Sequence, residues 1–266
     1  MVYKLGWFST GRDEAARELL TTIKNGIDKG EIDAKLEFVF SNREFGESKE
    51  SDKFFQLVRS YDIDLICFSS AKFKRELWKR KRERWRIEYD REIMKRLANY
   101  KVDLNILAGY MLIVGKELCR KYNLINLHPA APKGPIGTWQ EVIWKLIQQR
   151  AKETGIIIHL VTEILDRGPV MTYCTFPIVG KEFDELWKEI KGRDLSAIIK
   201  EEGENNKLFK KIREEGVKRE LPMIFHTIKE LASGRIVLKG KNVYVNGKLC
   251  PQGYCMNEIL KKVISE

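Results

Sequence analysis

Residues 104–129 read LNILAGYMLIVGKELCRKYNLINLHP and contain two short apolar runs, Leu104–Ala108 and Leu124–Leu127. Runs of this length, rich in Leu and Ile, are typical of strands that are buried on both faces of a sheet. We therefore predict a strand over each run. Three earlier runs of similar character are predicted as the preceding strands: Tyr3–Ser9, Leu36–Ser41 and Asp64–Phe68.

Helical patterns lie between these strands. After the first strand, the apolar residues from Ala15 to Ile23 recur three or four positions apart, which places them on one face of a helix. Helical segments are also predicted over Phe54–Val58 and Tyr89–Leu97. Strands that alternate with helices indicate an α/β protein, so the predicted fold class is a doubly wound, mainly parallel sheet.

The C-terminal half contains further strands and helices. A helix is predicted after Gly137, with Thr138 as its N-cap and an apolar stripe from Trp139 to Ile147 facing the core. Segment 180–216 is rich in Lys and Glu and is predicted to be a surface insertion with helical pieces. The other predicted elements are strands over Ile156–Val161 and Val170–Ile178, a turn over Leu165–Pro169, a last helix near Leu221–Leu231, and a terminal hairpin formed by Arg235–Leu238 and Asn242–Val245. We predict one domain over residues 1–266, with insertions near 70–88 and 180–216.

Composition limits the classes of function. The 266 residues carry 33% charged and 43% hydrophobic side chains, which is typical of a soluble globular protein. No run approaches the roughly 20 apolar residues that a membrane helix needs, and the N-terminus lacks the pattern of a signal peptide, so a cytoplasmic location is predicted. The five cysteines are odd in number and include no CxxC pair, which argues against a disulfide framework and against a zinc site.

The formal charge of +11 would suit an anionic partner, and part of it is concentrated in Lys72–Arg86. This segment holds nine basic and two acidic residues, with Trp78 and Trp85 among them. The simpler interpretation is a solvated helix face. The alternative is an arm that contacts RNA, because basic residues can bind phosphates while aromatic rings stack on bases.

Chemistry is expected at the ends of the strands, because ligands of open α/β sheets bind beyond the carboxyl ends of the strands. The first such end is Ser9–Thr10–Gly11–Arg12–Asp13, which precedes the first predicted helix. A helix N-terminus offers backbone N–H groups to a phosphate, and Arg12 could add a charged contact. An ordinary turn between strand and helix is the alternative.

A second strand end carries Asn126 and His128, which are two residues apart and therefore point to the same side of a strand. The chain has two other histidines, of which His159 is interpreted as structural and His226 as incidental. The third polar position is Asp166, in the turn after a strand. If Asp166 lies near His128, its carboxylate would orient the imidazole and raise its basicity.

Several motifs, taken in order, resemble the folate-dependent formyltransferase family. They are Leu107–Met111, Asn126–Pro129, Leu165–Pro169, Val39–Asn42 and Tyr89–Glu92. The C-terminal Gly234–Arg235, Asn246–Leu249 and Pro251–Tyr254 are similar to the branch of the family that formylates glycinamide ribonucleotide in purine biosynthesis.

The resemblance implies an α/β fold and transfer of a formyl group from 10-formyltetrahydrofolate to an amine without a metal. In that reaction Asn126 would bind the formyl oxygen, His128 would stabilise or protonate it, and Asp166 would pair with His128 and help to move a proton off the attacking amine. The phosphorylated substrate would be bound by Ser9, Thr10, Gly11, Arg12, Asp13, Gly109, Met111 and Glu220. The pterin of the folate would be framed by Leu112, Ile113, Val114, Thr162, Glu163, Ile164 and Leu165.

Some positions depart from the family pattern. The family has a phosphate loop of the Gly-Asn-Gly-Ser-Asn type where this chain has Thr10–Gly11–Arg12–Asp13, and Leu112 stands where an Arg is common. The open alternatives are formylation of another amine such as methionyl-tRNA, release of formate to water, and a non-catalytic relative that binds RNA. A monomer and a homodimer are both compatible with the sequence.

Overall fold

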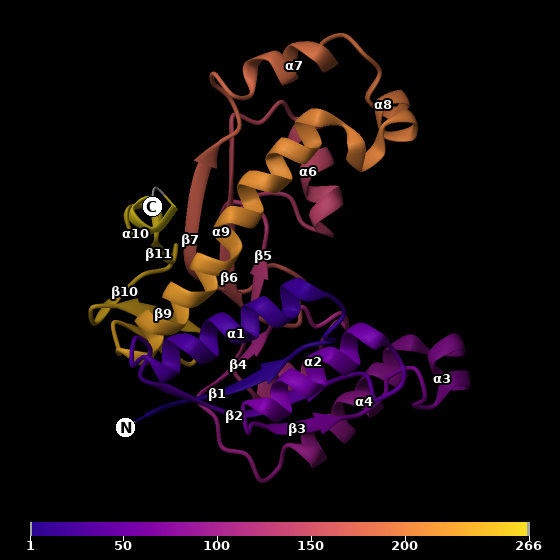
Figure 1. The fold of residues 1–266 in the computed structure, drawn as a ribbon, viewed down its shortest axis with the longest axis vertical. Coiled ribbons are helices and arrows are strands. Elements are labelled where there is room, and N and C mark those ends of the chain that lie inside the picture. Colours follow the sequence, from indigo (N-terminus) through magenta and orange to yellow (C-terminus); the bar gives the residue numbers. More distant parts are fainter. Residues whose placement is uncertain (1, 265–266) are drawn as a thin grey trace. The chain divides into compact units, whose positions relative to one another are not determined.

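The computed structural model describes residues 2–264 and contains a large sheet with the strand order β11-β7-β6-β5-β4-β1-β2-β3 (Figure 1). The strands are β1 Tyr3–Phe8, β2 Ala34–Ser41, β3 Asp64–Cys67, β4 Leu104–Leu107, β5 Leu124–His128, β6 Glu153–Leu160, β7 Val170–Pro177 and β11 Tyr254–Cys255. The pairs β1–β2, β1–β4, β2–β3, β4–β5 and β7–β11 are parallel, whereas β6 and β7 are antiparallel. The predicted mainly parallel α/β fold is therefore confirmed.

The chain packs as two compact units, which are described separately. Unit 1 comprises the residues up to Asn126 together with Leu160–Gly168 and Ile228–Val237. Unit 2 comprises Leu127–His159, Pro169–Thr227 and the residues from Leu238 onward. The prediction of a single domain stays a prediction.

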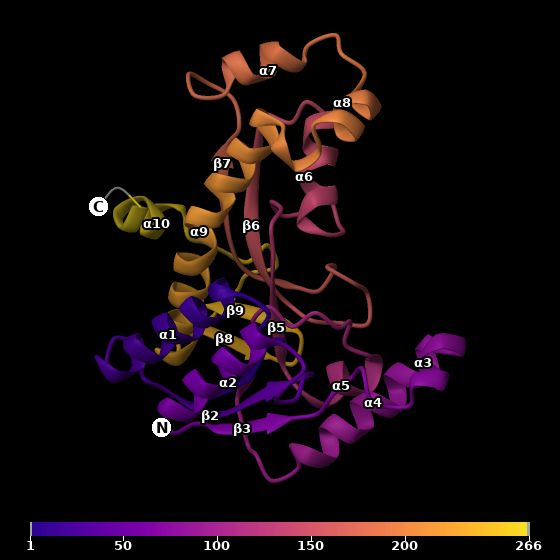
Figure 2. The same cartoon turned by 45° about the vertical axis from the view of Figure 1, so that its right-hand side comes forward.

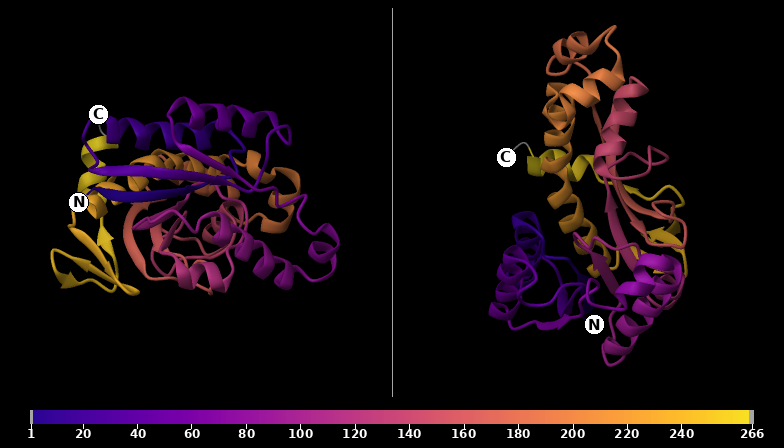
Figure 3. Two further views of the ribbon diagram at one scale, coloured as in Figure 1. Left: turned by 90° about the horizontal axis from the view of Figure 1, so that it is seen from below. Right: turned by 90° about the vertical axis from the view of Figure 1, so that its right-hand side faces the viewer.

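In unit 1, helices cover both faces of strands β1 to β3. Figure 3 shows α1 (Glu14–Asp28) and α2 (Lys49–Ser60) on one face, and α4 (Arg82–Arg96) on the other. Phe8, Phe38 and Phe40 belong to one buried cluster with side chains of α4 and with Leu118 of α5 (Lys116–Lys121). Burial on both faces explains why these strands appear in the sequence as continuous apolar runs.

The basic segment forms α3 (Arg75–Arg80) and the first turns of α4, which Figure 2 shows side by side. Of the two tryptophans in this segment, Trp85 is not exposed to stack on a base. This side chain is buried, stacks on Tyr89 at 4.8 Å between ring centroids, and donates its indole N–H to the Phe73 carbonyl at 2.8 Å. Trp78 is exposed, with the Arg82 guanidinium 4.7 Å from its ring centroid.

A buried carboxylate joins α4 to the segment before α5. Asp90 is 3% exposed, and its Oδ2 accepts the backbone N–H of Gly115 at 2.7 Å. Burial raises the pKa of Asp90 to about 7, although the hydrogen bond from Gly115 and the charge of Arg86 act in the opposite direction. Asp90 is therefore protonated in the folded protein at pH values where it is ionised in the unfolded chain.

We expect Asp90→Asn to remove a pH-dependent part of the stability. Because the pKa of Asp90 is higher in the folded protein, its contribution to the free energy of unfolding is complete below about pH 4. That contribution, about 4 kcal/mol in total, is lost as the pH rises through about 7. Asparagine keeps an acceptor for Gly115 and does not ionise. Urea unfolding of both proteins at pH 5 and pH 8 measures the difference. If the free energy of unfolding changes equally between pH 5 and pH 8 in both proteins, the pKa of Asp90 is the same in the folded and the unfolded chain.

In unit 2, the β6–β7 pair packs against α6 (Trp139–Gln148) and against the part of α9 (Lys207–Ala232) that ends at Thr227. The predicted cap of α6 is confirmed, because the Thr138 side chain accepts the Glu141 N–H and Glu141 accepts the Thr138 N–H. The stripe facing the core is also confirmed: Val142, Ile143, Leu146 and Ile147 are buried.

Segment 180–216 is more than the predicted surface insertion. It contains α7 (Asp184–Ile190), α8 (Leu195–Glu201), the 3-10 turn Gly203–Asn205 and the first part of α9. Its apolar side chains are part of the buried cluster around α6: Phe183, Leu208, Phe209 and Ile212. The helix predicted near Leu221–Leu231 therefore begins at Lys207 and continues through Pro222.

The C-terminal hairpin is larger than predicted. Strands β8 (Ile236–Lys239), β9 (Asn242–Val245) and β10 (Lys248–Leu249) form a three-stranded sheet. After β11, the described chain ends with a further helix, α10 (Asn257–Ile264). Within residues 2–264, no helix combines the length and the apolar character needed to cross a bilayer.

Candidate functional site

The loop Ser9–Asp13 leaves β1 and leads into α1. Ser9 and Thr10 are buried, and the Thr10 hydroxyl donates to Asn42 Oδ1 at 2.7 Å and accepts the Met111 N–H at 3.0 Å. The Thr10 N–H donates to the Gly109 carbonyl at 3.2 Å. These bonds hold the predicted phosphate loop beside the segment after β4, so Ser9, Thr10, Gly109 and Met111 lie together in unit 1.

Gly11 has a φ of +60°, a conformation that side chains with a Cβ rarely adopt. An added Cβ would also lie 2.7 Å from the Phe54 ring. The sharp turn at Gly11 allows the chain to enter α1 directly from the buried end of β1. Glycine at this position is therefore a requirement of the loop's shape.

Arg12 and Asp13 have different roles in the loop. Asp13 is the N-cap of α1, where its Oδ1 accepts the Ala16 N–H at 3.0 Å, and its Oδ2 accepts from Arg12 Nε at 3.0 Å. A carboxylate at this place already occupies part of the helix N-terminus and would repel a phosphate. Arg12 remains half exposed, with its terminal guanidinium nitrogens available to an anion.

Asn42 at the end of β2 belongs to this site and was not singled out as a site residue from the sequence. It is 5% exposed, accepts from Thr10, and its Nδ2 donates to Ser70 Oγ at 3.2 Å. Its position just after a strand was the signal that could have identified it. Asn42 fixes the hydroxyl of Thr10 and thereby the shape of the loop.

Two segments of unit 1 present large apolar side chains to solvent. Met111 and Ile113 are each 51% exposed in the segment after β4, whereas Ile164 and Leu165 are 67% and 52% exposed in the segment after β6. Both segments were predicted to frame a pterin. Where exposed apolar side chains form a contiguous patch, they mark an interaction or ligand-binding site.

The same two segments pack on one core cluster. Leu112 and Val161 lie against the cluster that contains Phe8 and Leu118, and Val114 is part of it. The Val161 N–H donates to the Leu124 carbonyl of β5 at 2.7 Å, and Arg120 Nε pairs with Glu163 at 2.6 Å. The segments that carry Met111, Ile113, Ile164 and Leu165 are therefore anchored to the core of unit 1.

Asn126 lies in β5, opposite Leu107 of β4. Its side chain is half-buried and forms no hydrogen bond with the part of the chain that the structure describes. The amide is thus available to a ligand. Because β5 runs from unit 1 into unit 2, His128 falls in unit 2 while Asn126 and Asp166 fall in unit 1.

His128 is 4% exposed, and its Nε2 lies 2.8 Å from the carbonyl oxygen of Pro135. A carbonyl can only accept, so Nε2 carries a proton in this arrangement. Nδ1 is then the atom that gains a proton when the ring becomes cationic. The hydrogen bond to Pro135 fixes the ring orientation and the tautomer together.

Asp166 lies in the turn between β6 and β7 and adopts a φ of +52°. The turn is fixed by Gly168, because a Cβ there would lie 1.6 Å from the Leu160 carbonyl oxygen. The close approach explains the glycine of the Asp166–Pro169 motif. The predicted pairing of Asp166 with His128 stays a prediction.

Glu220 lies on α9 in unit 2 and pairs with Arg213, whose guanidinium is 4.7 Å from the Trp139 ring centroid. Its carboxylate is already partnered in the protein. The prediction that Glu220 binds the ribose of a substrate stays a prediction.

The other candidate groups have structural surroundings. His159 is buried in β6, and His226 packs edge-on against Phe225 on α9. The five cysteines are not joined to one another by disulfides. In residues 2–264 no group of three or more His, Cys, Asp or Glu side chains is arranged to hold a metal ion.

Comparison with known proteins identifies similar sequences and structures. Residues 18–191 match the family model described as Formyl transferase. The chain is 26% identical over 243 residues to the phosphoribosylglycinamide formyltransferase of Haemophilus influenzae, a match that covers 90% of this chain and 93% of that protein.

Two solved structures share the fold. The phosphoribosylglycinamide formyltransferase of Coxiella burnetii, in complex with CHES, has a TM-score of 0.64 at 18% identity and covers 96% of this chain and 99% of its own. A formyltetrahydrofolate deformylase from Pseudomonas syringae pv. tomato has a TM-score of 0.60 at 17% identity, covering 92% of this chain and 66% of its own. The family model spans well over half of this sequence, and the chain therefore belongs to the formyl transferase family.

Proposed function

We propose that this protein transfers a formyl group from 10-formyltetrahydrofolate to the amine of glycinamide ribonucleotide, a step of de novo purine biosynthesis. Family membership supports the chemistry, and the Haemophilus influenzae relative supports the acceptor. The observation that carries the proposal is the exposed apolar surface of Met111, Ile113, Ile164 and Leu165 in the unit that also holds Asn126 and Asp166. A cytoplasmic location stays a prediction.

The formyl donor, 10-formyltetrahydrofolate, carries a flat pterin ring with a polar edge, and the protein must provide a surface that binds both. Backbone groups of Leu112–Val114 and Thr162–Leu165 would bind the hydrogen-bonding edge of the pterin, and the exposed apolar side chains would cover its ring. Pockets for such ligands combine apolar walls with a few polar groups that fix orientation. Gly109 and Met111, which are tied to the phosphate loop through Thr10, would line the acceptor side.

Asn126 would stabilise the charge that develops in the reaction. As the amine nitrogen attacks the formyl carbon, negative charge grows on the formyl oxygen, and the Asn126 amide would donate a hydrogen bond to it. One such donor, positioned in advance, is worth about 3–4 kcal/mol of transition-state stabilisation. The lack of an intramolecular partner for Asn126 in the described residues suits this role.

His128 and Asp166 would handle the protons. His128, cationic at Nδ1, would donate to the formyl oxygen, while Asp166 would take the proton that the attacking nitrogen loses. The bond between the formyl carbon and N10 of the folate then breaks, and N10 would take the proton that Asp166 accepted, which returns Asp166 to its ionised form. General acid–base assistance of this kind contributes about 10²–10⁴ in rate.

The Arg12→Ala variant is expected to raise KM for the phosphorylated acceptor about tenfold with little change in kcat. Arg12 would contact the phosphate, which does not react, so its loss weakens ground state and transition state equally. Steady-state kinetics with glycinamide ribonucleotide measure the effect, with Lys101→Ala as a control that removes an exposed charge outside the loop. An unchanged KM would remove Arg12 from the phosphate site.

Folate absorbance during incubation with 10-formyltetrahydrofolate, with and without glycinamide ribonucleotide, tests the function. Turnover only with this acceptor supports the proposal. Turnover that needs no amine would identify a hydrolase that releases formate. Turnover only with another amine, such as charged initiator tRNA, would replace the proposed acceptor, and the absence of all three would reject the proposed chemistry.

A further inference from the structure

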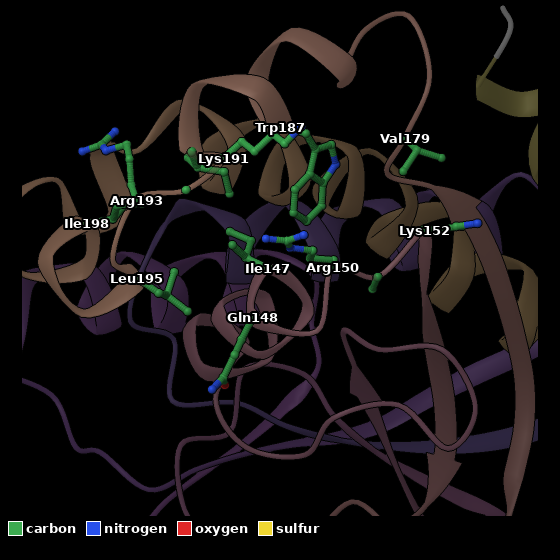
Figure 4. A pocket seen from close by; sticks show the side chains of 13 residues that line it. Ile147, Gln148, Arg150, Lys152, Val179, Trp187, Lys191, Arg193, Leu195 and Ile198 are labelled. Atoms are coloured by element: carbon green, nitrogen blue, oxygen red, sulfur yellow. The ribbon is translucent and has the colours of Figure 1, made fainter.

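Unit 2 contains a cavity of about 520 Å³ that shares no residue with the candidate site. Its walls come from the end of α6, the start of β6, the segment after β7, and helices α7 and α8 (Figure 4). Cavities that bind small molecules have volumes of about 300–1,000 Å³. Half of this wall belongs to segment 180–216, for which formyl transfer assigns no role.

Most of the cavity wall is apolar. Ile147, Val179, Ile190 and Leu195 line it, and the indole of Trp187 provides a flat surface. The Trp187 Nε1–H donates to the Ile178 carbonyl at 2.6 Å, so the ring is held in a defined place. A ring of this kind can stack on a planar group of a ligand.

The charged residues of the cavity are all basic: Arg150, Lys152, Lys191 and Arg193. Arg193 pairs with Glu202, whereas the other three form no ion pair within residues 2–264. Figure 4 shows the Arg150 guanidinium pointing into the cavity below the Trp187 indole, and the Lys152 ammonium pointing away. Arg150 and Lys191 are therefore the cations available to a ligand next to the indole.

Arg150 occupies a backbone position that normally favours glycine. Its φ is +49°, and the hydrogen bonds Arg150 N–H to Ile147 O (3.1 Å) and Ala151 N–H to Leu146 O (3.0 Å) form a Schellman motif at the end of α6. A cation near the last turn also interacts well with the helix dipole, but that interaction does not require this strained position. The left-handed position directs the Arg150 side chain from the end of α6 to the wall of the cavity, where glycine could take the same backbone conformation without strain.

We propose that this cavity binds a small organic anion with a flat apolar part. The planar part lies against Trp187, and the acid group is bound by Arg150 and Lys191. An inorganic anion would leave the apolar wall uncovered, and a neutral aromatic compound would leave both cations without a partner. The binding is independent of formyl transfer.

The fluorescent anion 8-anilinonaphthalene-1-sulfonate is a suitable probe, because it joins a planar aromatic system to a sulfonate. Arg150→Gly is the informative variant, since glycine relieves the backbone strain and is expected to give a thermal midpoint at least as high as that of the wild type. Lys133→Gly is the matched control: it removes a cation from another left-handed position, at φ +66°, that does not line the cavity.

We expect saturable binding of the probe to the folded wild-type protein, a loss of affinity of at least tenfold in Arg150→Gly and Lys191→Gln, and no change in Lys133→Gly. The uncharged N-phenyl-1-naphthylamine and inorganic sulfate should each bind more weakly. Hydrogen exchange with the probe bound should show protection in residues 187–198. Wild-type affinity in both cavity variants, protection elsewhere only, or no binding at millimolar probe would overturn the proposal.

Discussion

Replacing His128 by alanine is expected to lower kcat for formyl transfer about 10²–10⁴-fold while the protein folds normally. His128 is buried, and its Nε2 is held by the Pro135 carbonyl, so the ring is oriented before a substrate binds. In the proposed mechanism, alanine would remove the proton donor to the formyl oxygen, an interaction that strengthens only as the transition state forms. Single-turnover formyl transfer, together with circular dichroism, measures the chemical step and the fold.

His226→Ala is the matched control for this prediction. It removes an imidazole from α9 that contacts Phe225 and has no proposed role in catalysis. Its kcat should stay within about twofold of the wild-type value, because the substitution removes no group that the proposed mechanism uses for proton transfer or charge stabilisation. Near-normal turnover in His128→Ala would falsify the assignment of His128 as the acid.

The Asp166→Asn variant is expected to show a loss of similar size, about 10²–10⁴ in kcat. Asparagine has the same shape and tolerates the left-handed conformation of residue 166, so the change removes the charge and leaves the turn intact. In the proposed mechanism, the proton of the attacking amine would then have no acceptor. Rapid-quench measurement of formyl transfer under saturating substrates reports this step directly.

Asp62→Asn controls for the backbone, because Asp62 is an exposed aspartate of unit 1 with nearly the same φ, +54°. The double variant His128→Ala/Asp166→Asn tests whether the two residues act together. If they form one proton-transfer unit, the double variant should be little slower than the slower single variant. Multiplied losses would show that they act separately, and an active Asp166→Asn would exclude the carboxylate from catalysis.

Most strands could be predicted because a strand that is buried on both faces consists mainly of apolar residues, and such a run is visible in the sequence. Strands β1, β2 and β4 are covered on both faces, so most of their residues are apolar, and the predicted bounds agree with the structure to within two residues. The cap of α6 was also predictable, since Thr138 and Glu141 are three positions apart. These features depend on neighbours along the chain.

Short or highly charged helices were harder to predict. Helix α5 has six residues and no side-chain cap, so it gives too few turns for a periodic pattern. The first half of α9 is dense in Lys and Glu, and its few apolar residues are buried against α6. The Phe209 ring, for example, lies 4.8 Å from the Trp144 ring centroid. Part of the stability of that half therefore comes from packing partners in α6, more than 60 residues earlier in the chain.

The sequence by itself determined the α/β class, the family, the strand end that carries Asn126 and His128, and the turn that carries Asp166, because apolar runs and motif order are local properties. Tertiary structure alone decided that Asn42 holds Thr10, that Gly168 lies against the Leu160 carbonyl, and that Trp85 is buried while Trp78 is exposed. It also decided that segment 180–216 lines a cavity. Each of these depends on contacts between residues distant in the sequence or on the path of the backbone in space, which local composition does not encode.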